Sequence, residues 1–417
     1  MPAYYFGCVC LSLLVSVVRP GEIFPVLAIT RPAIVSFGLV ALAFFACSGP
    51  QRVQRMAPAG AGPMKWLLFL GFAGIVFSVY PRQALQSWIG MLIQIALYYF
   101  WLPAVGTFTG LRRCVTMLAF CAACLVVAMR FMAAVGVSTG RISVGASYDP
   151  NDIAMVLATL FPFVAYAFVQ GGLRARLFCT ALMGGIMLGI LSTGSRGGLL
   201  ALGVAGALLA FTPGTGVKIW HKLFVVVLAA GFFMSPAADK VKKRFQEVLS
   251  GRDYNLDTSE KTGGGRLMIW SDALKAIAER PLTGVGVGNA TTAMGAEYHR
   301  WMTVHNSYLQ VGVELGVPGL IVFLLLLRTI WRNCREAHRV FMPEPDMRYA
   351  ALLATCTRIA LVTYVVGAFF LSQAYSVVVP ILLLLSNGLV HSSRTRDETS
   401  YGPEYGGDFL VEGAQPG

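Results

Sequence analysis

The feature that most constrains this chain is a succession of apolar runs separated by Gly, Pro and basic residues. A helix needs about 20 apolar residues to cross a bilayer perpendicularly. Twelve runs approach that length, and several fall short of it. They cover residues 4–18, 33–48, 66–80, 87–105, 114–133, 152–169, 177–193, 197–212, 223–236, 305–327, 350–369 and 374–391. We therefore expect an all-α integral membrane protein with about twelve transmembrane helices.

Composition excludes a soluble enzyme, because only 13% of the residues are charged and 56% are hydrophobic, whereas soluble domains carry about 25% charged residues. A net charge of +13 would suggest nucleic acid for a soluble protein. In a membrane chain it bears on topology instead, and no nucleic-acid partner is expected. Cys121 and Cys124 have the spacing of a metal pair but lie in an apolar run without a nearby His. No metal, cofactor or disulfide framework is expected.

The positions of Lys and Arg predict the orientation, since short cytoplasmic loops carry an excess of both. With both termini in the cytoplasm, sixteen fall in cytoplasmic loops and five in short outer loops, namely Arg19, Arg31, Arg82, Arg141 and Arg196. Residues 1–236 then hold transmembrane helices 1–9, and 237–304 form one large outer loop. Residues 305–391 hold helices 10–12, and 392–417 form a cytoplasmic tail.

The large outer loop contains two segments with the apolar periodicity of amphipathic helices, Lys240–Ser250 and Arg266–Glu279. Pro281 is expected to end the second. Its apolar face would hold Leu267, Trp270, Leu274 and Ile277. Such helices lie in the membrane interface, either as a lid packed on the bundle or as a lid that shapes a site. The alternating glycines of GVGVGN (284–289) are expected to form a flexible connector.

Three basic side chains on the outer side are candidates for chemistry. Arg196 lies in a Gly/Ser-rich turn (STGSRGG, 192–198) and could grip a phosphate, or could be a surface arginine at a helix end. Arg266 opens an amphipathic helix, where anions are favoured, or is a solvated loop residue. His305 lies where the long loop enters a membrane helix, and could accept a proton or only cap the helix.

Other polar residues could support this set. Asp152, in the DPND motif (149–152), and Asn306 and His299, near His305, are possible supporting residues. Glu314 and Arg358 should both lie near the middle of the bilayer, where charged groups are costly. We expect them to form an intramembrane ion pair that holds segments 305–327 and 350–369 together.

Taken together, three segments resemble the O-antigen ligase and polymerase superfamily of bacterial envelope enzymes. They are RPLTGVGVGN…HNSYLQVGVELGVPGLIVFLLLL (280–327), DPND and STGSRGG. The resemblance implies a multi-pass glycosyltransferase of the bacterial inner membrane with a periplasmic active site. Its donor would be a glycan on undecaprenyl diphosphate. The family's catalytic histidine falls on His305, and its two functional arginines fall on Arg196 and Arg266.

Within the superfamily we favour an O-antigen ligase, which would transfer the glycan to lipid A–core with inversion and without a metal. One dominant outer loop and a compact chain support this choice. An O-antigen polymerase and a protein O-oligosaccharyltransferase remain alternatives, and a lipid-linked glycan transporter is a more distant one. The expected partners are the donor, the lipid A–core acceptor and membrane lipids.

Overall fold

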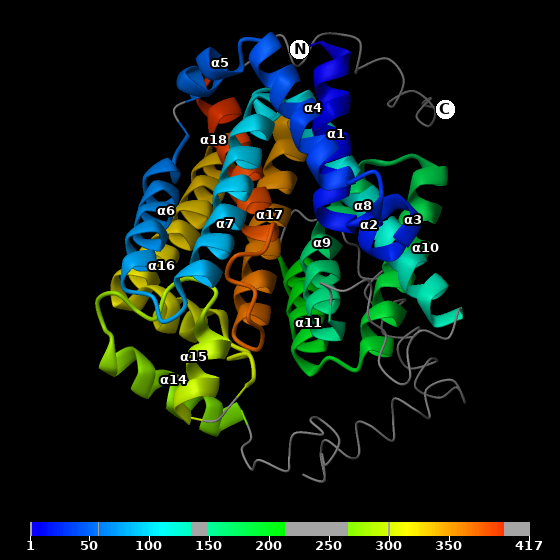
Figure 1. Ribbon diagram of the computed structural model, residues 1–417. Coiled ribbons are helices and arrows are strands. Elements are labelled where there is room, and N and C mark those ends of the chain that lie inside the picture. The colour runs from blue at the N-terminus through cyan, green and yellow to red at the C-terminus, as the bar shows by residue number, and fades with distance from the viewer. Residues whose placement is uncertain (1, 57, 135–148, 213–265, 299–300, 396–417) are drawn as a thin grey trace, which may run out of the picture.

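The computed structural model describes residues 2–56, 58–134, 149–212, 266–298 and 301–395, and the regular structure of these residues is entirely helical (Figure 1). The longer apolar helices are α1 (Ala3–Val18), α4 (Pro32–Ala46), α6 (Ala61–Val76), α7 (Pro81–Trp101), α8 (Phe108–Ala134), α9 (Pro150–Gln170), α10 (Leu173–Thr193), α11 (Arg196–Phe211), α16 (Ser307–Phe341), α17 (Arg348–Ala368) and α18 (Val378–Thr395). Shorter helices are α2 (Pro20–Ile23), α3 (Pro25–Ala28), α5 (Gly49–Met56), α14 (Arg266–Glu279) and α15 (Ala290–Tyr298). Two 3₁₀ turns are η1 (Leu102–Val105) and η4 (Pro345–Met347).

Each expected span in the described part of the chain coincides with one of these helices, whereas 223–236 lies outside the described residues. Among the described residues, six helices are long and apolar enough to cross a membrane, and a seventh span qualifies if α4 and α5, bent by 80°, form one broken span. Helices α1, α6 and α11 are apolar but shorter. The all-helical membrane class is confirmed, and the number of twelve spans stays a prediction.

Two helices, α9 and α17, form the centre of the bundle. Of their most apolar windows, 72% and 78% of the residues are buried inside the protein. Helix α9 packs against α8, α10, α11 and α17, and α17 also packs against α11 and α16. Small residues permit this close packing, as is usual between membrane helices. A Cβ atom at Gly367 of α17, for example, would lie 2.7 Å from the Met155 side chain of α9.

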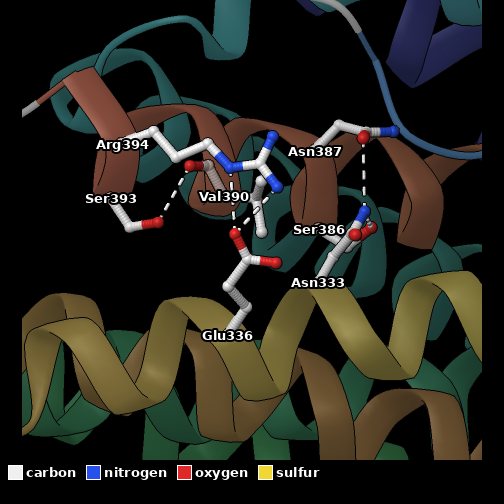
Figure 2. A network of polar contacts seen from close by, with 7 residues as sticks. All are labelled: Asn333, Glu336, Ser386, Asn387, Val390, Ser393 and Arg394. Carbon is white, nitrogen blue, oxygen red and sulfur yellow. Dashed lines mark hydrogen bonds and ion pairs between the residues drawn. The ribbon is translucent and has the colours of Figure 1, made fainter.

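A buried polar network fixes α18 against α16 and α7. Asn333 of α16 donates from Nδ2 to Asn387 Oδ1 of α18 at 3.2 Å, as Figure 2 shows. Asn387 donates in turn to the Tyr98 hydroxyl of α7 at 2.8 Å. In the last turn of α18, Arg394 forms an exposed ion pair with Glu336 of α16 at 2.8 Å (Figure 2). Because unpaired polar groups are costly at membrane depth, the three helices are held in one register.

Helix α16 is broken at Gly316, and the 281–289 segment fills the break. Gly316 has φ 68° and ψ −172°, and Pro318 follows without an N–H to donate back along the helix. The freed carbonyl of Glu314 accepts from Gly286 N at 3.0 Å, while Val317 N donates to Pro281 O at 2.8 Å. The two halves of the 280–327 sequence unit are therefore hydrogen-bonded to each other.

The expectation of a flexible connector at 284–289 is wrong. Val287 and Asn289 are fully buried, and Asn289 Nδ2 bonds Ser78 Oγ at 2.6 Å. Gly284, Gly286 and Gly288 have positive φ. A Cβ at Gly284 would lie 2.4 Å from the Glu314 carbonyl carbon. The glycines therefore serve close backbone approach rather than mobility.

Helix α14 has the bounds expected from its periodicity, and Pro281 follows its end. Its buried face was misplaced by about one residue, because Ile269, Ala273 and Ala276 are buried whereas Leu274 is 57% exposed. These residues form a second small core with α15 and with Val313 of α16. Helices α14 and α15 thus lie together at one end of the bundle, opposite α5 (Figure 1). The Lys240–Ser250 segment lies outside the described residues.

Candidate active site

Arg196 is the first residue of α11, at the tip of the α10–α11 hairpin. Gly194 turns the chain with φ 64°, and the Ser195 side chain caps α11 by accepting from Gly198 N at 3.2 Å. The Arg196 side chain is exposed. A Cβ atom at Gly197 would lie 2.8 Å from Phe370 Cβ. Gly197 therefore lets the start of α11 lie against the α17–α18 connection, and Gly198 faces Ala154 of α9.

Asp152 lies in the first turn of α9. The helix is capped by Asp149, whose Oδ1 accepts from Asn151 N at 2.6 Å and from Asp152 N at 2.8 Å. The Asp152 carboxyl, which is partly buried, hydrogen-bonds the Gln373 side chain and lies within the electrostatic reach of Arg19. Asp149 thus has a capping role, and Asp152 contacts the same connection that contacts α11.

His305 directly precedes the cap of α16 and has a left-handed backbone with φ 51°. Such a conformation is uncommon for a residue with a side chain and clusters at functional sites. Thr303 Oγ1 lies 3.1 Å from its Nε2 and 3.3 Å from its Nδ1, so this hydroxyl can hydrogen-bond one ring nitrogen at a time. The ring is partly exposed.

Asn306 caps α16, because its Oδ1 accepts from Tyr308 N at 3.0 Å and Leu309 N at 3.1 Å. It is 3% exposed. Ser307 Oγ donates to Leu371 O at 2.6 Å and accepts from Gln373 N at 2.9 Å. Asn306 therefore fixes the start of α16, and Ser307 ties that start to the α17–α18 connection.

A continuous set of contacts joins the neighbourhoods of the three basic candidates. Phe370, beside Gly197, packs on Phe369 with ring centroids 5.3 Å apart. Phe369 meets Trp270 of α14 edge-on at 5.2 Å. Trp270 Nε1 then donates to Val304 O at 3.1 Å. Gly197, next to Arg196, and Trp270, one turn after Arg266, thus both contact the Phe369–Phe370 pair, and Trp270 links it to the residue before His305.

Arg266 is placed as the first residue of α14, which matches its expected position at a helix start. His299 lies outside the described residues. The α14–α15 pair is also tied by the Tyr298 hydroxyl, which donates to Glu279 Oε1 at 2.9 Å. Burial, together with this carboxylate, raises the pKa of Tyr298 above its ordinary value. Below that pKa, the hydroxyl keeps the proton that it donates.

The expected ion pair between Glu314 and Arg358 is not formed. The Arg358 guanidinium lies 5.5 Å from the ring centroid of Trp331. That residue is seventeen positions beyond Glu314, or about 25 Å along a helix at 1.5 Å per residue. The Glu314 carboxyl instead accepts from Gln310 Nε2 of its own helix at 3.5 Å. The error arose because α16 extends to Phe341, so that Arg358 meets its distal half.

Sequence reasoning missed Thr303, Trp270 and the Phe369–Gln373 segment as parts of this region. Thr303 was detectable in principle, since a hydroxyl two residues before a candidate base can orient its ring. Nothing in the spacing of the 369–373 segment pointed to a site. Among the described residues, no three His, Cys, Asp or Glu side chains gather closely enough to hold a metal ion.

Comparison with known families matches residues 178–324 to a family model described as O-antigen ligase. This region contains Arg196, Arg266 and His305. A Rickettsia conorii protein named "putative polysaccharide ligase" is 25% identical over 144 residues, which is 32% of this chain and 34% of the relative. An uncharacterized Haemophilus influenzae protein is 26% identical over 198 residues, or 43% of this chain and 49% of the relative. The matches thus span about a third and about half of these relatives' lengths.

Proposed function

We propose that this chain, whose residues 178–324 match the family model described as O-antigen ligase, is an O-antigen ligase of the bacterial inner membrane. It would transfer a glycan from undecaprenyl diphosphate to lipid A–core at the periplasmic face. The observation that carries the proposal is the convergence described above. The start of α11 contacts Phe370, Trp270 of α14 packs on Phe369, and Trp270 also hydrogen-bonds the residue before His305.

In the proposed reaction, Arg196 and Arg266 bind the donor diphosphate. Two guanidinium groups can each grip phosphate oxygens in a bidentate way. As the glycan leaves, negative charge grows on the bridging phosphate oxygen, and the arginines stabilise it. This electrostatic contribution is usually the largest in such reactions. With two guanidinium cations present, the proposal needs no divalent metal.

His305 is the proposed general base. It accepts the proton of an acceptor sugar hydroxyl as that oxygen forms a bond to the anomeric carbon. The bond from that carbon to the phosphate oxygen breaks on the opposite face, so the configuration inverts. The electron pair leaves with undecaprenyl diphosphate, and the imidazolium returns its proton to solvent. Thr303, whose hydroxyl lies within hydrogen-bonding distance of both ring nitrogens, holds the imidazole in place.

The proposed topology keeps both termini in the cytoplasm and the site in the periplasm. Its support is the arrangement of charge along the bundle. Helix α5, with Arg52 and Arg55, lies at the end opposite α14 and α15 (Figure 1). Arg174 and Arg176, at the start of α10, follow the end of α9 that is distant from Asp152. This asymmetry agrees with the excess of basic residues on cytoplasmic sides.

The test is a transfer assay with purified protein in detergent and EDTA. Undecaprenyl-diphosphate glycan is the donor, and rough lipopolysaccharide is offered in one arm and omitted in the other. Glycan on the lipopolysaccharide is the expected result. Elongation of the lipid-linked glycan without acceptor would mean a polymerase, and no transfer to either would contradict the proposal.

A matched pair of variants separates binding by Arg196 from a general effect of charge. Arg196 and Arg174 are both exposed and both lie in the first turn of neighbouring helices, at opposite ends of one hairpin. We expect Arg196→Gln to lower kcat by about 10²–10³-fold, the usual effect of losing one transition-state donor. Arg174→Gln should leave it unchanged. Equal activity of the two variants would remove Arg196 from the mechanism.

A further inference from the structure

A second polar site lies in a cavity of about 390 Å³ on a different part of the bundle. Its walls come from α5, from the η1–α8 connection, and from α1 and α18. The volume is within the roughly 300–1,000 Å³ range of small-molecule pockets. Because α5 and α14–α15 lie at opposite ends (Figure 1), this cavity is separate from the candidate active site.

The ionisable side chains that line the cavity are all basic. Arg52, Arg55, Arg113 and His391 line it, and none of the described residues in its lining is acidic. Arg52 is held by a bond from Nε to the Cys47 carbonyl at 3.3 Å. That bond still leaves the two Nη groups of its guanidinium for a phosphate. Like charges at close range repel one another, so such a set is best satisfied by an anion.

The remainder of the lining is mixed. Thr107 and Thr109 supply hydroxyl donors, whereas Phe6 and Met56 supply apolar surface. The guanidinium of Arg113 lies 5.6 Å from the Phe6 ring centroid, a cation–π arrangement that holds its plane. A ligand with an anionic head and an adjoining apolar part would satisfy both halves of this lining.

We propose that this cavity binds a phosphate-bearing anion, and that the ligand in the membrane is the headgroup of an anionic phospholipid. The cavity lies where candidate span Pro81–Val105 ends and candidate span Phe108–Ala134 begins. That position is the level of lipid headgroups. Basic pockets between membrane helices recognise anionic lipids in this way. Free phosphate shares the same recognition chemistry, and the experiment distinguishes the two sources.

The experiment is native mass spectrometry of the full chain after delipidation in detergent. Phosphatidylglycerol is added in one arm and phosphatidylcholine with the same acyl chains in another, and inorganic phosphate competes in a third. Arg52→Gln/Arg113→Gln is compared with Arg174→Gln/Arg176→Gln, which removes the same charge from exposed positions outside the cavity.

We expect the unmodified protein to retain phosphatidylglycerol and not phosphatidylcholine. Retention should fall about 25-fold in the cavity variant, since each of the two basic residues near an anionic surface contributes about a factor of five. It should persist in the control. If phosphatidylglycerol stays bound in millimolar phosphate, the ligand is the lipid headgroup. If phosphate displaces the lipid, and the displacement depends on the cavity arginines, free phosphate is the stronger ligand.

Two results would overturn the proposal. One is equal retention by the two double variants, which would assign the effect to general surface charge. The other is equal retention of the two phospholipids. If the cavity variant fails to fold, Arg55→Gln alone serves instead, because Arg55 is exposed on the short helix α5 and lines the same cavity.

Discussion

The hydrogen bond from Trp270 to Val304 gives the sharpest test of how the site is held. Trp270→Phe removes the indole N–H that donates to Val304 O at 3.1 Å. It keeps an aromatic ring against Phe369, now 5.2 Å away. The chain contains a matched control, since Trp88 Nε1 donates to Leu68 O at 2.9 Å. Trp88→Phe therefore deletes the same type of bond between α6 and α7.

The two variants should be alike in stability and unlike in activity. Loss of one such bond lowers the free energy of unfolding by about 1 kcal/mol. The bond that Trp270→Phe removes also fixes the backbone next to His305. If about 1 kcal/mol of alignment is lost in the transition state, kcat falls about five-fold, because 1.36 kcal/mol corresponds to ten-fold. In Trp88→Phe, kcat should be unchanged.

The assay combines glycan transfer at saturating donor with thermal unfolding in the same detergent. Similar unfolding midpoints for Trp270→Phe and Trp88→Phe show that the two deletions are comparable. A lower kcat in Trp270→Phe alone supports the positioning role. If both variants lose kcat equally, or neither does, then the bond to Val304 does not position His305 and the reasoning is refuted.

Three further outcomes follow from the geometry. His305→Ala should lower kcat by about 10²–10⁴-fold, the usual contribution of a general base, with donor binding retained in a filtration assay. Gly284→Ala should prevent stable folding or lower the unfolding midpoint sharply, because its Cβ would meet backbone at 2.4 Å, whereas Gly203→Ala, with open space around it, should not. Asn387→Leu should lower the free energy of unfolding by about 1–3 kcal/mol, because its buried partners lose a hydrogen bond. Arg394→Gln, in an exposed ion pair, should lower it by less than about 1 kcal/mol. Equal unfolding midpoints for the two variants would contradict this ranking.

The helical class and most helix positions could be predicted from sequence because apolar length and breakers are local signals. Helix α14 began and ended where its periodicity and Pro281 indicated. Its buried face shifted because the partner surface, formed by α15 and Val313, decides which residues pack. Local patterns contain no information on that partner.

Long-range register was the part that sequence could not supply. The ion pair of Glu314 and Arg358 was inferred by counting residues from each expected helix end. The inference failed because α16 extends to Phe341, beyond the expected end at residue 327. The 284–289 glycines suggested mobility, but the carbonyls that Val285 N and Gly286 N bond lie 28 residues away on a broken helix. Only the tertiary structure shows that Gly316 and Pro318 free those partners.

For the candidate site, sequence supplied the residues and the structure supplied their relation. Arg196, Arg266 and His305 were separate candidates in separate segments. The Phe369–Leu371 segment, which has no chemical signal of its own, connects their surroundings. Aromatic packing and a single indole bond do this, and neither has a recognisable spacing in the sequence.

The most direct test of the central claim is an experimental structure of the protein with undecaprenyl diphosphate bound. The account predicts that the diphosphate lies between the starts of α11 and α14, with its oxygens on Arg196 and Arg266 and its glycan end facing His305. A diphosphate bound elsewhere, without contact to Arg196, Arg266 or His305, would contradict it. The cavity lined by Arg52, Arg55 and Arg113 is one such place.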